Sequence, residues 1–316
     1  MNKNLLNLNY WTQLCLDMAV SSLNFGWGNI ESMQWFDKLS PHAFVLAEFS
    51  FSKAFTTLDT NDGLVLLYNT LGYGYRYIGQ YEKSLICYKK ALLLQKDALS
   101  MYSSYKSVLY HKIAWLHDEM GNIDFALDWY KKSLYISETI HGREGISTAY
   151  TYSNIGCVYH KKRELKKAMD YYKRALFILE AVLGKHSPDV AATCNNIANI
   201  YAERRKFEQA LHWHNRDLDI CKRTLGEKHP DTATSYNNIG HFYFDTGKIG
   251  YAIEYFAKAI SIRYNILGKE HPSTEQSINE ARLVYSAQEK LALSFEEWLS
   301  EVINKQSINN NEEGGQ

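Results

Sequence analysis

Apolar residues recur at spacings of three and four along most of the chain, in paired segments separated by short polar breaks. In the stretch 233–267, Tyr236, Ile239 and Tyr243 share one face of a helix, a polar break follows around Gly247, and the same period then resumes. The pattern predicts a helix, a short turn and a second helix in each segment pair.

This pattern recurs every 42 residues without insertion. Fixed self-similarity of this length is typical of a solenoid. Two columns hold small residues and therefore predict close approach of the paired helices, while two columns of rings fill the space around them. The small columns are Gly72, Ala114, Gly156, Ala198 and Gly240, and Ser84, Ala126, Ala168, Ala210 and Ala252; the ring columns are Tyr88, Tyr130, Tyr172, His214 and Phe256, and Tyr75, His117, Tyr159, Tyr201 and Tyr243.

A connector closes three of the repeats: "VLGKHSPD" at 182–189, "TLGEKHPD" at 224–231 and "ILGKEHPS" at 266–273. Its glycine is expected to end the second helix and its proline to block continuation. With the small and ring columns, the connector resembles the tetratricopeptide repeat in the 42-residue variety found in kinesin light chains. The resemblance implies an all-α fold, a right-handed superhelical solenoid of antiparallel helix pairs whose first helices line a concave groove.

The repeat register divides the chain into four parts. We expect residues 1–63 to form an N-terminal helical segment, including a helix at 41–57 packed on the first repeat. Five tetratricopeptide repeats follow at 64–273. Residues 274–305 read as a degenerate sixth repeat, a C-terminal cap that keeps Tyr285 and Trp298 but places Arg282 in a small column. The tail 306–316 has little to bury and is predicted to be disordered.

Composition narrows the class of protein. Lys plus Arg and Asp plus Glu number 35 each, so no global charge favours nucleic acid or an anionic membrane. The five cysteines show no CxxC spacing, which fits a reducing compartment. The N-terminus lacks the apolar run of a signal peptide or a membrane span. We therefore expect a cytoplasmic protein with no nucleic-acid or membrane partner; its oligomeric state stays open.

Candidate chemistry is sparse. The segment 59–63 invites a calcium-loop reading, but counting back from Gly63 puts Leu58 at the first ligand position. His212 and His214 are two apart on a predicted helix, so they point to different sides, and His214 belongs to a ring column. Phosphate-loop, nucleophile-elbow and zinc-protease motifs do not occur. The sequence predicts no enzyme activity, no metal and no cofactor.

Positions on the first helices that face away from the packed side are the candidate peptide-binding groove. Their asparagines can pair with both groups of a peptide backbone, and the resemblance implies this role, because asparagines at these positions contact bound peptide in kinesin light chains. The alternative is that each asparagine bonds the backbone of the neighbouring repeat and so staples the array; both interpretations stay open, and both can be true. The candidates are Asn69, Tyr73, Arg76, His111, Lys112, Trp115, Asn154, His160, Lys161, Asn195, Asn196, Asn199, Asn237, Asn238 and His241.

Charge and aromatic side chains in this set suggest the partner. Lys112 and Lys161 would attract acidic residues, and Tyr73 and Trp115 would bury an apolar or aromatic anchor. A basic run at 160–167, with 204–206 at the equivalent turn, reads either as a solvated turn or as a second acidic-partner site.

One residue breaks a further small column made of Ala91, Ser133, Ala175 and Ala259. Asp217 stands at the fourth of these five positions. A carboxylate between packed helices is costly unless it is paired or solvated. Asp217 therefore marks either a local opening of the fourth repeat or a salt bridge to an arginine such as Arg216 or Arg223.

These observations predict a non-catalytic protein-protein interaction scaffold or adaptor that binds an extended peptide segment of a partner in the concave groove. The alternative is a regulatory peptide-sensing module that controls a partner enzyme or transcription factor. A catalytic domain within residues 1–63 is disfavoured because so short a segment seldom builds a pocket.

Overall fold

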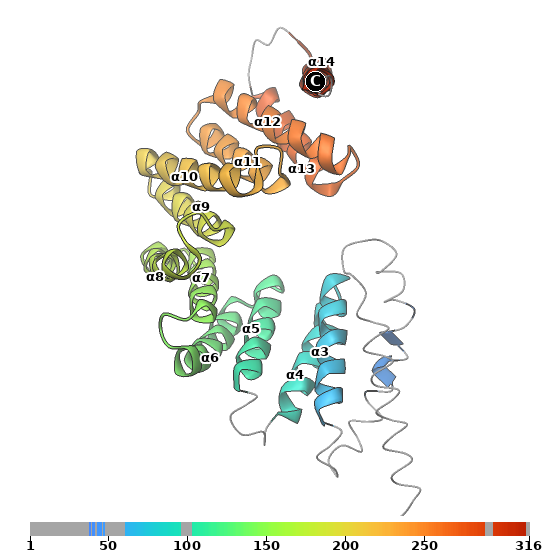
Figure 1. The fold of residues 1–316 in the computed structure, drawn as a ribbon, viewed down its shortest axis with the longest axis vertical. Helices are drawn as coiled ribbons and strands as arrows, with labels where there is room; N and C mark the ends of the chain where they lie inside the picture. Colours follow the sequence, from blue (N-terminus) through green and yellow to red (C-terminus); the bar gives the residue numbers. More distant parts are fainter. Residues whose placement is uncertain are drawn as a thin grey trace, which may run out of the picture. The chain divides into compact units, whose positions relative to one another are not determined.

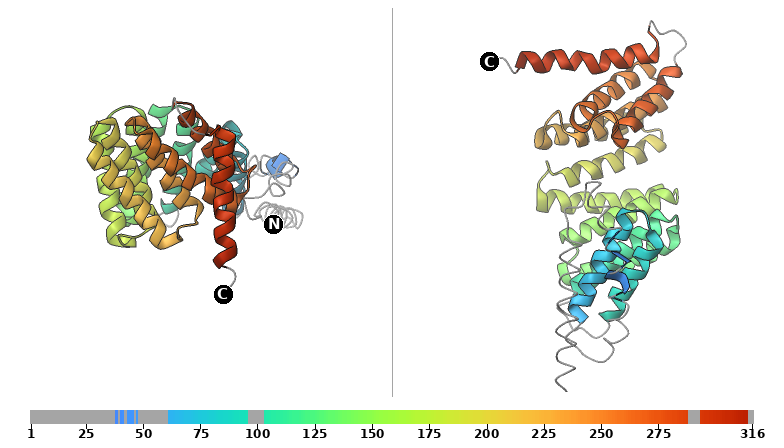
Figure 2. Two further views of the ribbon diagram at one scale, coloured as in Figure 1. Left: turned by 90° about the horizontal axis from the view of Figure 1, so that it is seen from above. Right: turned by 90° about the vertical axis from the view of Figure 1, so that its right-hand side faces the viewer.

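We describe the fold from a computed structural model, which places residues 38, 40, 41, 43–45, 47, 61–95, 103–287 and 293–313. Within these ranges every regular element is an α-helix and no strand occurs. Consecutive helices pack as hairpins (Figures 1 and 2). The predicted all-α fold of helix pairs is confirmed. The chain divides into two compact units, residues 1–162 and 163–316, which we treat separately.

The first unit contains helix pairs at the predicted period. Helix α3 packs against α4, α5 against α6, and α6 against the following helix α7. The helices are α3 (Asn61–Tyr77), α4 (Tyr81–Leu94), α5 (Ser103–Glu119), α6 (Ile123–His141) and α7 (Ile146–Lys161).

The second unit continues the same arrangement. Helix α9 packs against α10, α11 against α12, and α12 also contacts α13 and α14. The helices are α8 (Leu165–Leu183), α9 (Pro188–Glu203), α10 (Phe207–Leu225), α11 (Pro230–Asp245), α12 (Ile249–Leu267), α13 (Pro272–Ser286) and α14 (Phe295–Glu313). The boundaries of the five repeats and the cap themselves stay a prediction.

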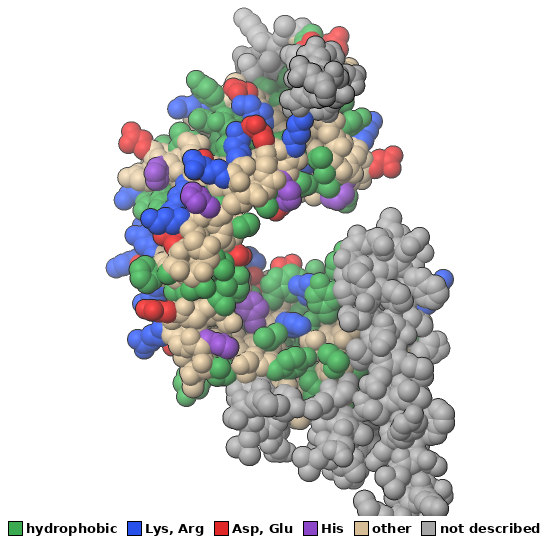
Figure 3. Space-filling model, viewed as in Figure 1, with side chains coloured by type: hydrophobic (Ala, Val, Ile, Leu, Met, Phe, Trp, Pro, Cys, Tyr) green, Lys and Arg blue, Asp and Glu red, His purple; other side chains and the backbone are tan. Residues whose placement is uncertain are grey.

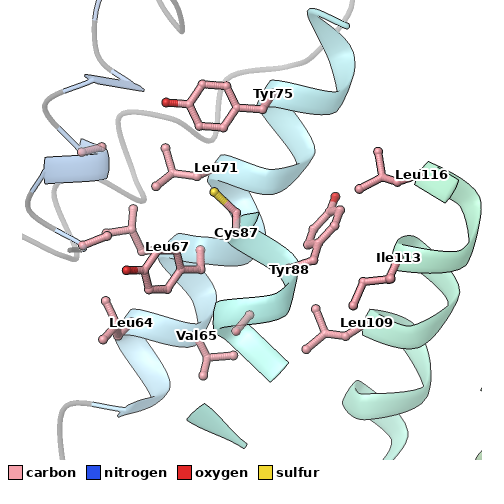
Figure 4. Packing of buried hydrophobic residues seen from close by; sticks show 14 residues of the cluster. Leu64, Val65, Leu67, Leu71, Tyr75, Cys87, Tyr88, Leu109, Ile113 and Leu116 are labelled. Atoms are coloured by element: carbon pink, nitrogen blue, oxygen red, sulfur yellow. The ribbon is translucent and has the colours of Figure 1, made fainter. Parts of the chain in front are cut away.

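The small columns and the Tyr88 column form the core as predicted, whereas Tyr201 and Tyr243 of the second ring column are only half-buried. All five members of the Tyr88 column are at most 2% exposed. At the crossing of α3 and α4, a Cβ added to Gly72 would lie 2.6 Å from Cε1 of Tyr88, whose ring faces side chains of α5 (Figure 4). At the crossing of α11 and α12, a Cβ on Gly240 would lie 3.2 Å from the Phe256 ring. The missing side chains are therefore what allow these helices to approach closely.

The turn within each pair uses one left-handed residue. Gly79, Gly121 and Gly247 have φ near 75°, the left-handed conformation that commonly ends a helix and that glycine adopts without strain. The equivalent residues of the two intervening repeats are Arg163 (φ 60°) and Arg205 (φ 56°). A side chain in this region is strained, because its Cβ crowds the following carbonyl oxygen.

The connectors between pairs behave as predicted at their glycines. Gly184, Gly226 and Gly268 have positive φ and cap the C-terminal ends of α8, α10 and α12. The prolines do more than block the preceding helix, because each is the first residue of the next one, where its missing N–H leaves no bond unmade. The residues before them are the N-caps: Ser187, His229 and His271 accept a hydrogen bond from the backbone N–H two residues on.

The chain ends match the sequence predictions in part. Described residues between 38 and 47 are helical, Ala43 and Ala47 are buried in the core of the first pair, and Phe44 packs edge-on against Tyr75 at 6.3 Å. The rest of the predicted 41–57 helix and most of residues 1–40 lie outside the described residues. The predicted disordered tail is corrected at 306–313, where α14 continues to Glu313, since extending a formed helix is easier than nucleating one.

Candidate functional site

Polar side chains of successive first helices bond one another across the first unit. Lys112 Nζ on α5 donates to Asn69 Oδ1 on α3 at 2.7 Å. Asn154 Nδ2 on α7 lies 3.0 Å from His111 Nε2 on α5. Lys161 Nζ on α7 bonds Asp118 Oδ1 on α5 at 2.8 Å. Each of these pairs joins residues 43 apart, one repeat plus one position. Asn69 and Asn154 therefore each bond a side chain of the neighbouring repeat.

Two cations lie together beside three aromatic rings on α3, α4 and α5. The Arg76 guanidinium carbon is 4.8 Å from the Tyr73 ring centroid and 4.6 Å from that of Trp115. Lys112 Nζ is 5.3 Å from the Tyr88 ring centroid. Burial, and then the charge of Arg76, lowers the pKa of Lys112 to about 8. We call Tyr73, Arg76, Lys112 and Trp115 the cationic cluster.

Neither cation of this cluster is neutralised within the described residues. Arg76 and Lys112 form no ion pair there, and Arg76 Nε is buried without a hydrogen-bond partner. Tyr73 and Trp115, predicted to point outward, are half-buried against the guanidinium. The cluster can stabilise a negative group, because a desolvated cation gains most from a partner of opposite charge.

A cleft of about 380 Å³ adjoins Lys112 between α5, α6 and α7. We call it the first cleft. Serine and threonine hydroxyls and the Asn154 amide line it. Burial lowers the pKa of His111 to about 4, so this residue is neutral at physiological pH and adds no charge to the cleft. Its lining residues are Ser107, Val108, His111, Lys112, Ser133, Ser137, Ser147, Tyr150, Thr151 and Asn154.

Several cations of the basic run at 160–167 form ion pairs with acidic neighbours. Lys162 bonds Asp124 at 2.6 Å, within the first unit. Arg163 bonds Glu203 at 2.7 Å, within the second. Lys and Arg side chains gather over α8 and α10 in Figure 3. These pairs favour the solvated-turn reading of the run. His160 is half-buried and Lys161 is exposed.

The outward placement of Asn237 on α11 is wrong. Its side chain is only 6% exposed, its Nδ2 donates to Glu280 Oε2 at 2.7 Å, and its Oδ1 accepts from Ser277 at 3.2 Å. His241 Nε2 also reaches Glu280 at 3.2 Å. Burial alone would raise the pKa of Glu280, but hydrogen bonds from His241, Asn237 and Gln276 outweigh it and lower the pKa to about 2. Asn237 is a staple because α13 packs where solvent was expected.

Three further predicted groove asparagines of the second unit lie together at one cleft. Asn196 and Asn238 make no side-chain hydrogen bond within the described residues, and Asn195 Oδ1 is buried without a partner. All three line a cleft of about 360 Å³ between α9, α10 and α11, which we call the second cleft. Asn199 is half-buried. The residues that line the second cleft are Pro188, Ala191, Ala192, Asn195, Asn196, Asp217, Cys221, Leu225, Asp231, Thr234, Ser235 and Asn238.

The two clefts occupy equivalent places in the repeat. Each of the ten residues that line the first cleft has its counterpart, two repeats on, in the lining of the second. The two clefts differ in charge. The first cleft contains Lys112 and no carboxylate, whereas the second contains Asp217 and Asp231 and no lysine or arginine.

Sequence reasoning missed Ser277 and Glu280, because it read the sixth repeat only as a cap. A usable signal was present: complementary polar residues 43 apart, such as Asp118 and Lys161, recur along the first helices. It also missed the equivalence of the two clefts, which depends on which side chains leave a gap between helices.

The part of the chain that the structure describes offers neither a metal-binding cluster nor a membrane-spanning helix. No group of three or more His, Cys, Asp or Glu side chains there could hold a metal ion. Within the same ranges, no helix combines the length and the apolar character needed to cross a membrane.

Comparison with solved structures places the chain among helical repeat proteins. BtubC (BKLC) from P. vanneervenii is 22% identical, with a TM-score of 0.62 over 82% of this chain and 96% of that one. A putative kinesin light chain with nearly identical TPR-like repeats from Podospora anserina is 16% identical, with a TM-score of 0.56 over 67% and 99%. A Rap protein complexed with Competence and Sporulation Factor is 15% identical, with a TM-score of 0.56 over 89% and 71%. At these identities the likeness shows the fold alone.

No curated protein matches the chain. The tetratricopeptide repeat family model matches four overlapping segments, residues 64–139, 119–181, 147–223 and 189–265. These segments cover more than half of the sequence and include the small columns, the ring columns and two connectors. Repeats of this kind are generally non-catalytic and bind other proteins. The chain belongs to the tetratricopeptide repeat family, in a form similar to the repeats of kinesin light chains.

Proposed function

We propose that the protein is a non-catalytic scaffold or adaptor that binds an acidic, extended peptide segment of a partner protein on the first unit. The observation that carries this proposal is the cationic cluster: Arg76 lies close enough to Lys112 for its charge to lower the pKa of Lys112, and neither cation has a carboxylate partner within the described residues. Two desolvated cations side by side are unfavourable in the free protein, so a bound carboxylate relieves both their repulsion and their lost hydration.

The aromatic rings add selectivity to this charge. Trp115 and Tyr73 hold the Arg76 guanidinium by cation–π contact, which leaves the guanidinium edge free for bidentate bonds to a carboxylate. The first cleft next to Lys112 exposes Tyr150 and Val108 and has room for an apolar or aromatic side chain. A peptide in which an acidic residue is followed by an aromatic anchor can therefore place the carboxylate at the cationic cluster and the ring in the first cleft.

Peptide arrays test the proposal. Acetylated and amidated hexapeptide pools, each with Glu, Gln or Arg fixed at one position and Trp at another, are probed with the full chain. We expect retention on Glu–Trp pools to exceed that on Gln–Trp pools by about tenfold, and Arg76→Gln or Lys112→Gln to remove this preference. Lys131→Gln, which removes an exposed positive charge from α6, is the matched control and should change nothing. Equal retention of Glu and Gln pools by the wild type would refute the proposal.

A further inference from the structure

A carboxylate lies where the repeat elsewhere places a small side chain. Asp217 on α10 is 4% exposed and replaces the Ala or Ser of the equivalent positions. Burial raises its pKa to about 6, with the charge of Asp231 acting in the same direction, so the group is still ionised near pH 7.5. A buried negative charge is unfavourable unless a positive group or several hydrogen bonds meet it.

The protein supplies Asp217 with no positive partner within the described residues. Its bonds come from two weak or neutral donors, the Cys221 thiol at 3.7 Å and the Ser235 hydroxyl. The two arginines expected to pair with it are engaged elsewhere: Arg216 bonds Glu180, and Arg223 bonds Asp219 at 2.9 Å. The salt-bridge reading of Asp217 is therefore wrong, and the local-opening reading fits the second cleft.

The second cleft gives access to this carboxylate. Asp217 lies in its lining together with Asp231, and the buried Oδ1 of Asn195 adds an acceptor with no donor of its own. The apolar part of the wall comes from Pro188, Ala191, Ala192 and Leu225. A long aliphatic stem with a positive end suits such a cleft, because the stem covers apolar wall while the charged end meets the acceptors.

We propose that the second cleft binds the ammonium or guanidinium group of a lysine or arginine side chain in an extended peptide segment, with Asp217 as its counter-ion. Asn196 and Asn238 lie on either side of the cleft, on α9 and α11, with free amide groups. Each amide offers donors and an acceptor to the peptide backbone around the basic residue. A metal ion is a poorer fit, because no cluster of three ligand side chains exists among the described residues.

The first cleft is the internal comparison. It keeps the same ten positions but holds Ser133 in place of Asp217 and Ser147 in place of Asp231. One repeat geometry thus presents a basic site in the first unit and an acidic site in the second. The second-cleft proposal does not depend on the acidic-segment proposal, because different residues in a different unit carry it.

The test uses hexapeptide pools with Arg, Lys, Gln, Glu or norleucine fixed at one position and no other charged residue. We expect the wild-type chain to retain Arg and Lys pools at least about fivefold better than Gln and norleucine pools. Asp217→Asn keeps the shape of the side chain and should lower retention of Arg and Lys pools to the Gln level. Asp219→Ser, which removes a half-exposed carboxylate from the same helix outside the cleft, is the matched control and should leave the preference intact.

Three results would overturn the proposal: no preference of the wild type for basic pools, the same preference in Asp217→Asn, or loss of preference in Asp219→Ser. Binding of free agmatine tests whether the cleft recognises a peptide or only a small basic molecule. Agmatine binding as tight as that of an Arg hexapeptide would also overturn the proposal. Arg76→Gln should leave Arg pools unaffected, so failure at the second cleft is distinguishable from failure at the cationic cluster. Asn196→Ala with Asn238→Ala should reduce retention of every basic pool by about fivefold.

Discussion

The crossing of α3 and α4 at Gly72 predicts a large effect of a single methyl group. Gly72→Ala places a Cβ 2.6 Å from Cε1 and 2.8 Å from Cδ1 of Tyr88. Ordinary carbon contacts lie at about 3.5–4.0 Å, so the ring must move by about 1 Å. Tyr88 is fully buried, and Leu109, Ile113 and Leu116 stand on its far side (Figure 4). Overpacking of this kind destabilises by about 1–3 kcal/mol.

Helix propensity opposes this effect by up to about 1 kcal/mol, since alanine favours a helix more than glycine does. We therefore expect a net loss of about 1–2 kcal/mol for Gly72→Ala. Two other glycines calibrate the estimate. At Gly240 the added Cβ would sit 3.2 Å from Phe256 and the two effects should roughly cancel, whereas exposed Gly250 has nothing within 4 Å and its alanine variant should be stabilised.

We would measure urea unfolding by circular dichroism and hydrogen exchange of α3 and α4 by mass spectrometry. The local measurement is needed because the units of a repeat array need not unfold together. In a Tyr88→Leu background, Gly72→Ala should cost much less than it does in the wild type, because the clashing ring is gone. If Gly72→Ala exchanges and unfolds like the wild type, the glycine is not what sets the approach of these helices.

Three further changes follow from the structure. Asn237→Ala should lower the free energy of unfolding by about 1–2 kcal/mol, because Glu280 loses a buried hydrogen-bond donor. The control Asn238→Ala should change it by less than about 0.5 kcal/mol, because Asn238 has no such bond within the described residues. Equal urea midpoints for the two variants would contradict the staple role of Asn237. The folded pKa of Asp217 is raised from 3.8 to about 6, so the stability it contributes when protonated is present below pH 3.8 and is lost as pH rises through 6. Asp217→Asn should therefore match the wild type near pH 3 and exceed its stability by about 1–3 kcal/mol at pH 8, in melts recorded across that range. Arg205→Gly should raise the free energy of unfolding by about 0.5–1 kcal/mol. Glycine relieves the strain of the left-handed conformation, and this gain outweighs the flexibility that glycine adds to the unfolded chain. An unchanged melting temperature would count against that strain.

The sequence by itself determined the local architecture of the repeat. Small residues at Gly72 and Gly240, rings at Tyr88 and Phe256 and left-handed glycines at the turns report constraints within one helix pair. Such constraints act over a few residues and recur at a fixed period, so one chain carries several copies of each signal. The resemblance to tetratricopeptide repeats rests on the same residues and was predictable for the same reason.

Tertiary structure decided which polar side chains of the first helices are available to a partner. Asn237 and Asn238 are neighbours in sequence with the same chemistry, yet only Asn237 donates a hydrogen bond to Glu280 on α13. Likewise, the sequence showed that Asp217 interrupts a small column, but only packing showed that its neighbouring arginines pair elsewhere and that a cleft exposes it. A side chain's hydrogen-bond partner depends on the rotation of one helix against another, and periodicity along a single helix does not contain that rotation.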